Sequence, residues 1–143
     1  MPWQQLIADV GLEIDPESGL PAYREICLTV PRQSGKTSLL LAWELQRCLR
    51  WPTAQRVAFT SQTGWDARRK LVDDQVPLLL GSPLKVAVER IYRGAGNESV
   101  IFKNGSRIDV LAATESAGHG RTIDLGVIDE AFADIDYRRG ASI

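Results

Sequence analysis

The sequence has little of the chemistry that builds a metal centre or a disulfide framework. It contains two cysteines, Cys27 and Cys48, far apart and in apolar surroundings, and a single histidine, His119. Neither cysteine belongs to a paired thiol motif, so we expect a buried, reduced pair and not a zinc site or a crosslink. One histidine cannot form a metal site by itself.

Targeting signals, long apolar runs and an excess of one charge are also missing. The first five residues lack the basic region and apolar stretch of a signal peptide. The longest apolar run, Leu39–Trp43, is far too short to cross a bilayer, so we expect a soluble, cytoplasmic protein with no membrane partner. With a net charge of -1, binding to nucleic acid would need a local basic surface.

The order of the predicted elements is that of an α/β domain with a mainly parallel sheet and helices on both faces. A short N-terminal helix precedes a loop at residues 11–22, which is rich in Pro and Gly. Apolar runs with β-branched residues predict strands, and longer amphipathic stretches predict helices. The predicted strands are Ile26–Val30, Arg56–Thr60, Lys85–Val88 and Leu125–Ile128, and the predicted helices are Ser38–Leu49 and Trp65–Gln75.

A β-hairpin is predicted at about residues 99–111. Two apolar runs flank Asn104-Gly105, a pair typical of two-residue turns because both central residues need positive φ. Such a turn would place Ile101 opposite Ile108.

Two charged helix faces are expected to point to solvent. One consists of Glu44, Arg47 and Arg50, at a spacing of three. The other is Arg68–Lys70, with Asp73 and Asp74 one turn later. A self-paired, solvated face is the better interpretation of that cluster than a contact with DNA phosphates. The second predicted helix should turn Trp65, Leu71 and Val72 inward.

The most informative stretch is Val30-Pro31-Arg32-Gln33-Ser34-Gly35-Lys36-Thr37, between a predicted strand and a predicted helix. A bound triphosphate needs backbone N–H groups around it, a helix N-terminus, a lysine on its outer phosphates and a hydroxyl on Mg²⁺. Gly35 allows close backbone approach, Lys36 supplies the charge and Thr37 supplies the hydroxyl. The usual pattern has glycine where Val30 stands, so the prediction rests on the strand–loop–helix context.

A second motif ends the strand predicted at Leu125–Ile128. Asp129 follows it directly, and a carboxylate in that place can hold a metal ion. The adjacent Glu130 can orient and deprotonate an attacking water. Since ligand sites in open α/β sheets lie at the carboxyl ends of strands, we expect Lys36 and Asp129 to face one crevice.

With these motifs the chain resembles the N-terminal half of the ATPase domain of a tailed-phage terminase large subunit, the motor that packages DNA. That family's nucleotide loop also lacks the leading glycine and contains an arginine, here Arg32. Further resemblances are Pro2–Gln4 to its adenine-side glutamine motif, Phe59–Thr63 with Asp66–Arg68 to the segment after its second strand, and Thr114–Gly120 with Ile128–Phe132 to its carboxylate motif.

The resemblance implies a P-loop NTPase fold with ATP and Mg²⁺ as cofactors. The implied nucleotide-binding residues are Gln4, Arg32, Gln33, Ser34, Gly35, Lys36 and Thr37. The implied metal ligands are Thr37 and Asp129, and the implied catalytic residues are Lys36 and Glu130. For His119 and Arg121, insertion into a neighbouring subunit's site and a plain loop role are both open.

The resemblance also implies double-stranded DNA, a portal and a small terminase subunit as partners, a homo-oligomeric ring, and the bacterial host cytoplasm as the location. Residues 1–143 would be a partial P-loop ATPase domain, with the rest of the ATPase and a C-terminal nuclease domain absent. We therefore expect weak or no activity from these residues alone. Two alternatives are a helicase- or recombinase-like P-loop ATPase and a truncated remnant that does not hydrolyse ATP.

Overall fold

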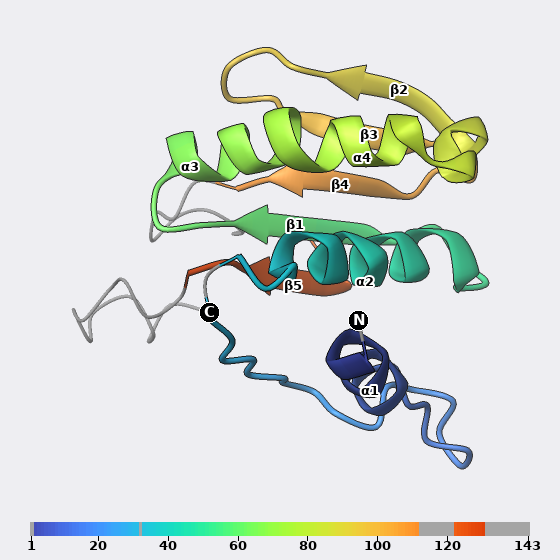
Figure 1. The fold of residues 1–143 in the computed structure, drawn as a ribbon. Helices are drawn as coiled ribbons and strands as arrows, with labels where there is room; N and C mark the ends of the chain where they lie inside the picture. The colour runs from blue at the N-terminus through green and yellow to red at the C-terminus, as the bar shows by residue number, and fades with distance from the viewer. Residues whose placement is uncertain (1, 32, 112–121, 131–143) are drawn as a thin grey trace. The chain divides into compact units, whose positions relative to one another are not determined.

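Helices and a mixed β-sheet make up the part of the molecule that the structure describes (Figure 1). The computed structural model describes residues 2–31, 33–111 and 122–130. It divides into two compact units, Met1–Trp43 and Glu44–Ile143, and each is described by itself. In chain order the elements are α1 (Pro2–Gly11), α2 (Lys36–Arg50), β1 (Arg56–Thr60), α3 (Gly64–Arg69), the π-helix η1 (Lys70–Gln75), α4 (Val76–Gly81), the 3-10 helix η2 (Pro83–Ala87), β2 (Val88–Tyr92), β3 (Ser99–Phe102), β4 (Arg107–Val110) and β5 (Leu125–Ile128).

The first unit contains α1, a loop and the start of α2. At Gly11, where α1 ends, a Cβ atom would lie 2.7 Å from the Trp43 ring, so a residue without a side chain is needed for this close approach. A bridge between Ile14 and Pro21 closes the loop that follows. The predicted N-terminal helix and the loop after it are confirmed.

Two predictions that involve this unit are wrong. Residues 26–30 form no strand, and Ile26 is 43% exposed. A strand needs a neighbour for its backbone N–H and C=O groups, and no described strand forms a ladder with this segment. The cysteines are not a buried pair, because Cys27 is exposed while Cys48, in the second unit, is buried.

The second unit is built on a five-stranded sheet in the order β2-β3-β4-β1-β5. Strand β1 lies parallel to β4 and β5, whereas β2–β3 and β3–β4 are antiparallel pairs. The predicted mainly parallel sheet is therefore corrected to a mixed one. Short turns can join only antiparallel neighbours, and β2, β3 and β4 are joined by short connections. The predicted strands at β1 and β5 are confirmed to the residue.

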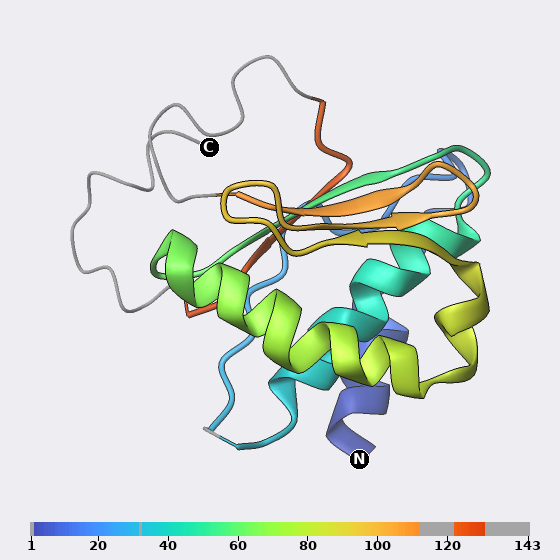
Figure 2. The ribbon, with the colours of Figure 1, turned by 90° about the horizontal axis from the view of Figure 1, so that it is seen from above.

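Helices cover one side of this sheet. Figure 2 shows α3, η1 and α4 as a continuous rod on that side. Within the described residues of the second unit no helix lies on the opposite side, so the prediction of helices on both faces is not met there. The rod belongs to the crossover from β1 to β2. Most of the crossover from β4 to β5, residues 112–121, lies outside the described residues.

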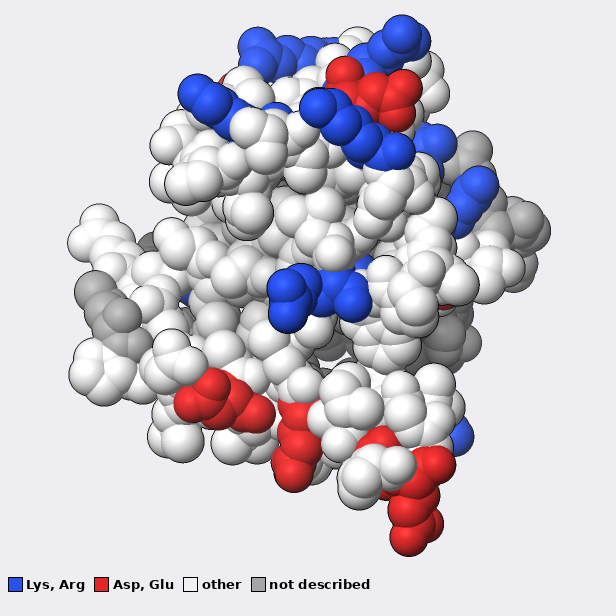
Figure 3. Space-filling view, turned by 90° about the vertical axis from the view of Figure 1, so that its right-hand side faces the viewer, with Lys and Arg blue, Asp and Glu red and all other residues white. Residues whose placement is uncertain are grey.

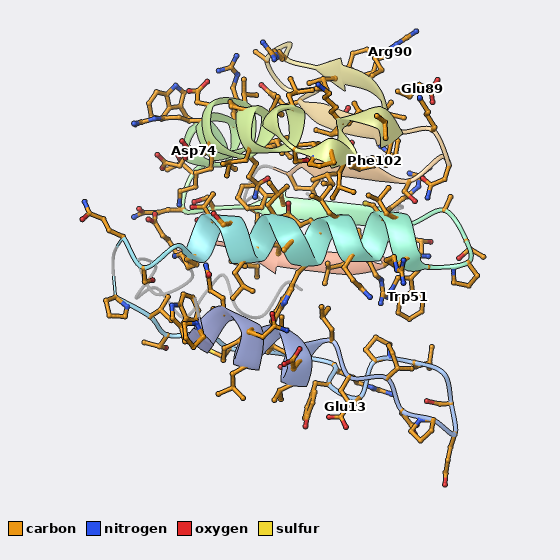
Figure 4. All side chains as sticks on the ribbon, turned by 45° about the vertical axis from the view of Figure 1, so that its right-hand side comes forward. Glu13, Trp51, Asp74, Glu89, Arg90 and Phe102 are labelled. Atoms are coloured by element: carbon orange, nitrogen blue, oxygen red, sulfur yellow. The ribbon has the colours of Figure 1, made fainter. Side chains whose placement is uncertain are left out.

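Apolar side chains from the sheet and the rod form the core. Phe59, Phe102 and Leu71 are each at most 1% exposed. Figure 4 shows Phe102 pointing from β3 toward the helical layer, while Glu89 and Arg90 point outward. Burying a side chain of this size stabilises the fold by roughly 1.5–3 kcal/mol. This packing holds the helical rod against the sheet whose strand β5 leads into the carboxylates.

The predicted helix Trp65–Gln75 is present but longer, and it changes pitch. Helical turns run without a break through α3, η1 and α4 to Gly81. The buried residues Ala67, Leu71, Gln75 and Leu79 recur every four residues. At 3.6 residues per turn such positions drift around an α-helix. The wider π-helical turn offsets this drift and keeps them toward the sheet.

Two local predictions in this region are wrong. Trp65 is 62% exposed instead of turned inward. The strand predicted at Lys85–Val88 begins only at Val88, because Pro83–Ala87 form η2. The Ser82 hydroxyl caps η2 by accepting a hydrogen bond from Leu84 N at 3.2 Å.

The hairpin of β3 and β4 is confirmed, but its turn differs from the prediction. Gly105 has a φ of 85°, and Asn104 does not have positive φ. This pattern belongs to a three-residue loop with glycine in the left-handed position, and not to a two-residue turn. The extra residue shifts the register by one, so Ile101 lies opposite Arg107 and not Ile108.

Candidate functional site

The predicted phosphate loop lies in the first unit and leads directly into α2. Gln33 and Gly35 have φ values of 60° and 89°, with Ser34 between them outside the positive-φ region. Alternation of this kind turns successive backbone N–H groups toward one side, as in anion-binding nests. Helix α2 begins at Lys36, so Lys36 and Thr37 lie in its first turn, where the N–H groups also favour an anion. Arg32 lies outside the described residues.

Gln4 holds the loop from α1. Its Nε2 donates a hydrogen bond to Gly35 O at 2.8 Å. The sequence predicted Gln4 on the adenine side of a nucleotide, and the structure gives its amide a contact inside the phosphate loop. A Cβ at position 35 would lie 2.8 Å from the same Nε2 atom. Gly35 is therefore needed chiefly for its φ, and a side chain there would also displace the Gln4 amide.

The loop fits a phosphate ligand by its own geometry. Ser34 Oγ is buried and makes no hydrogen bond with any described residue, so it is available to a ligand. Together with the nest, the helix N-terminus and the Lys36 charge, it forms a donor set of the kind that a triphosphate requires.

The predicted carboxylates lie in the second unit, at the carboxyl edge of the parallel strands. Asp129 follows β5, and its backbone N donates to Thr60 O, the last residue of β1, at 2.9 Å. Asp129 is 4% exposed. Glu130 is more open, with its side chain 48% exposed, and has a φ of 61°. A glutamate in the left-handed region is strained, and such strain is concentrated at functional sites.

A lysine that the sequence did not predict joins these carboxylates. Lys70 Nζ lies 2.9 Å from Asp129 Oδ2 and 3.1 Å from Glu130 Oε2. It also donates to Ser61 Oγ, just after β1, at 3.0 Å. Burial lowers the pKa of Lys70, but the hydrogen bonds and negative charges of the two carboxylates outweigh it and raise the pKa above its usual value. We call Ser61, Lys70, Asp129 and Glu130 the carboxylate cluster.

The expected self-paired face at Arg68–Lys70 is corrected by these contacts. Lys70 pairs with Asp129 and Glu130, and Arg68 Nε pairs with the buried Glu98 at 2.8 Å. The available signal was spacing: Lys70 comes three residues after Ala67 and directly before Leu71, both buried. A residue next to the buried face of a helix can reach the sheet with its side chain. Pairing each basic residue with the acidic residue four positions later ignores this possibility.

The prediction that Glu44 faces solvent is also wrong. This residue was expected in a solvent stripe, but it is fully buried, and Gln75 Nε2 donates to its Oε1 at 3.3 Å. The pKa of Glu44 is raised from 4.5 to about 8: burial is the main cause, the Gln75 hydrogen bond opposes it, and the charge of Asp129 adds to the rise. Glu44 is therefore mostly protonated at neutral pH.

The structure thus gathers the predicted residues into two groups. Gln4, Gln33, Ser34, Gly35, Lys36 and Thr37 belong to the first unit, and Asp129 and Glu130 to the second. That Lys36 and Asp129 face one crevice remains a prediction. His119 and Arg121 lie outside the described residues. Among the residues that the structure describes, no three His, Cys, Asp or Glu side chains form a metal-binding group.

Comparison with known families supports one of the possibilities that these motifs leave open. The family model described as "Terminase large subunit, T4likevirus-type, N-terminal" matches residues 27–137, roughly three quarters of the chain. The chain belongs to this terminase family. The match includes the phosphate loop and both carboxylates, whereas Gln4 lies before it. No curated protein and no solved structure gave a match.

Membership of the terminase family supports a role in phage DNA packaging. It agrees with the resemblance seen in the sequence. No helix among the described residues has the length and apolar character needed to span a membrane.

Proposed function

We propose that this terminase chain is the ATPase motor portion of the large subunit, which hydrolyses ATP with Mg²⁺ and so drives DNA into proheads. The observation that carries the proposal is the phosphate loop, in which left-handed Gln33 and Gly35 lead into a helix that begins with Lys36 and Thr37. Few ligands other than a phosphate chain use a nest, a helix N-terminus and a lysine together.

Each residue has a distinct role in this proposal. Loop N–H groups and Lys36 bind the phosphates and stabilise the charge that develops in the transition state. Thr37 and Asp129 would hold Mg²⁺ through oxygen atoms, and the ion, when bound, would neutralise phosphate charge. Glu130, the more exposed carboxylate, orients the attacking water and accepts its proton. Gln4 and Arg32 would complete the nucleotide contacts.

The proposed partners follow from the family. They are double-stranded DNA, a portal, a small terminase subunit and further copies of the chain in a ring, in the host cytoplasm. On the face drawn in Figure 3, Lys and Arg side chains form small separate groups and no continuous basic patch. That face therefore offers no reason to assign the DNA contact to it.

A helicase- or recombinase-like ATPase is disfavoured by the family match. A nucleotide-binding form that does not hydrolyse ATP is distinguished from the motor by one substitution. In Glu130→Gln, ATP affinity should persist while turnover falls by about 10²–10⁴, because the glutamate acts on the water only during reaction. The measurements are nucleotide binding and phosphate release under saturating ATP.

The matched control is Glu89→Gln, which removes the same charge from an exposed position on β2 and should leave turnover unchanged. Equal turnover in Glu130→Gln and the unmodified protein would remove Glu130 as the base. Absence of turnover in the unmodified protein, with intact ATP binding, would favour the form that does not hydrolyse ATP.

A further inference from the structure

Lys70 is the charged residue of the carboxylate cluster for which neither the motifs nor the proposed mechanism provides a role. Its ammonium carries three N–H donors, and it lies within hydrogen-bond distance of three acceptors, on Asp129, Glu130 and Ser61. The lysine side chain is 19% exposed and that of Asp129 only 4% exposed, so water screens the pair weakly. These contacts therefore hold both carboxylates firmly in place.

The same oxygen atoms are those that a divalent cation would use. Mg²⁺ and Mn²⁺ prefer carboxylate oxygens, and Lys70 Nζ already lies 2.9 Å from Asp129 Oδ2. Two cations a few ångströms apart repel each other strongly at a partly buried site. An ammonium and a divalent ion cannot both be fully bound to these carboxylates without that cost.

We propose that Lys70 is a positioning residue that holds Asp129 and Glu130 together and competes with a divalent cation for their oxygens. The inference rests on the proposed function, in which Asp129 is a ligand of the cation and Glu130 orients the attacking water. Its consequence is that the bare ion binds weakly. Phosphate oxygens supply further ligands to the ion, so cation occupancy becomes coupled to nucleotide binding.

Two local features place Lys70 in this role. It is the first residue of the π-helix η1, and single π-helical turns are frequent at functional sites. It also comes one turn after the buried Ala67, so its side chain is directed toward the carboxyl ends of β1 and β5. Glu130, whose backbone has a φ of 61°, accepts the contact from Lys70 Nζ through its Oε2 atom.

The test uses Mn²⁺ without nucleotide, and the electron paramagnetic resonance signal of free Mn²⁺ reports binding. Lys70→Gln keeps a hydrogen-bond donor and removes the charge. We expect it to bind Mn²⁺ at least about tenfold more tightly than the unmodified protein, the effect of about 1.4 kcal/mol of relieved repulsion. Lys70→Arg keeps the charge and should retain the original affinity. Lys85→Gln makes the same change of charge at an exposed lysine on η2 and should also leave the affinity unchanged.

Thermal unfolding with and without Mn²⁺ covers the case in which Lys70→Gln is unstable. Recovery of its folding on addition of Mn²⁺ would support the competition, because the ion then replaces the lost ammonium. Failure to fold even with Mn²⁺ would overturn it and leave Lys70 with a structural role only.

Asp129→Asn separates this inference from the proposed function. If Mn²⁺ binding requires Asp129 but is equal or weaker in Lys70→Gln, the competition is refuted and the metal role of Asp129 survives. If Asp129→Asn binds Mn²⁺ as the unmodified protein does, the proposed metal ligand is wrong and the inference falls with it.

Discussion

At the scale of single residues, the phosphate loop depends on backbone angles that most residue types avoid. Gly35 has a φ of 89°, and Gln33 adopts a left-handed conformation without being glycine. Holding a residue with a side chain in such a region costs about 1–3 kcal/mol. The sequence indicated the need for glycine at position 35 because the motif requires close approach. It gave no sign of the strained Gln33, since no pattern of residue types encodes it.

Gly35→Ala should therefore weaken Mg–ATP binding by roughly five- to tenfold, the effect of about 1 kcal/mol. The new Cβ would meet Gln4 Nε2, but that amide ends a flexible side chain and can move, so the backbone angle carries most of the cost. Calorimetric titration measures the affinity. Gly19→Ala is the matched control, because Gly19 has a φ of 69° and open space around it, in the loop after α1. Equal losses of affinity in the two variants would contradict the assignment of Gly35 to the phosphate site.

At the scale of elements, α2 and η1 are joined by the buried pair of Glu44 and Gln75. Glu44 Oε2 and Gln75 Oε1 are both buried and make no hydrogen bond with described residues. If Glu44 is protonated on Oε2, that hydroxyl can donate a hydrogen bond to Gln75 Oε1. Together with the bond from Gln75 Nε2 to Glu44 Oε1, the acid and the amide would then share two hydrogen bonds. The groups that act on Glu44 are Gln75 and the negative charge of Asp129. Glu44 in turn acts on the Cys48 thiol, whose pKa is raised to about 12 by burial first and by the charge of Glu44 second.

The stability of the fold should fall as pH rises through this titration. The folded-state pKa of Glu44 lies above its unfolded value of 4.5, at about 8, so its contribution is complete below 4.5 and is lost between 4.5 and 8. At about 1.4 kcal/mol per pKa unit the loss is a few kcal/mol. Denaturant unfolding at a series of pH values measures it. Glu44→Gln, which is always neutral, should flatten the dependence; an equally steep fall in that variant would assign the effect to another group.

The strands, the hairpin and the π-helical turn differ in how far the sequence predicts them. Strands β1 and β5 are defined by short apolar runs, and their bounds were predicted to the residue. The hairpin was predicted from Asn104-Gly105, but its loop length was not, because the same two residues suit both a two- and a three-residue loop. The π-helical turn of η1 could not be predicted, since apolar residues every four positions also suit an α-helix. Lys70 was missed for a different reason: it was paired with Asp74, four residues later, and its place beside the inward stripe of the helix was not considered.

At the scale of the whole molecule, the carboxylates lie at the carboxyl end of the predicted strand β5, which is parallel to β1 and stands at the edge of the described sheet. Parallel pairing of β1 with β5 brings Thr60 and Asp129 to one edge, which is the usual place of ligands in such sheets. The antiparallel half, β2 and β3, follows from short connections that the predicted mainly parallel sheet did not take into account. The P-loop NTPase fold remains a prediction, because it requires the first unit's loop and the second unit's carboxylates to act on one nucleotide.

The proposed function is tested most directly by the affinity of the protein for ATP in the presence of Mg²⁺, measured by calorimetric titration for the unmodified chain and for Lys36→Ala. We expect the unmodified protein to bind ATP and Lys36→Ala to lose roughly 100-fold in affinity, the effect of about 3 kcal/mol for a charge-assisted phosphate contact. Lys85→Ala, at an exposed lysine, should bind as the unmodified protein does. An unchanged affinity in Lys36→Ala would contradict the phosphate loop and the motor function derived from it.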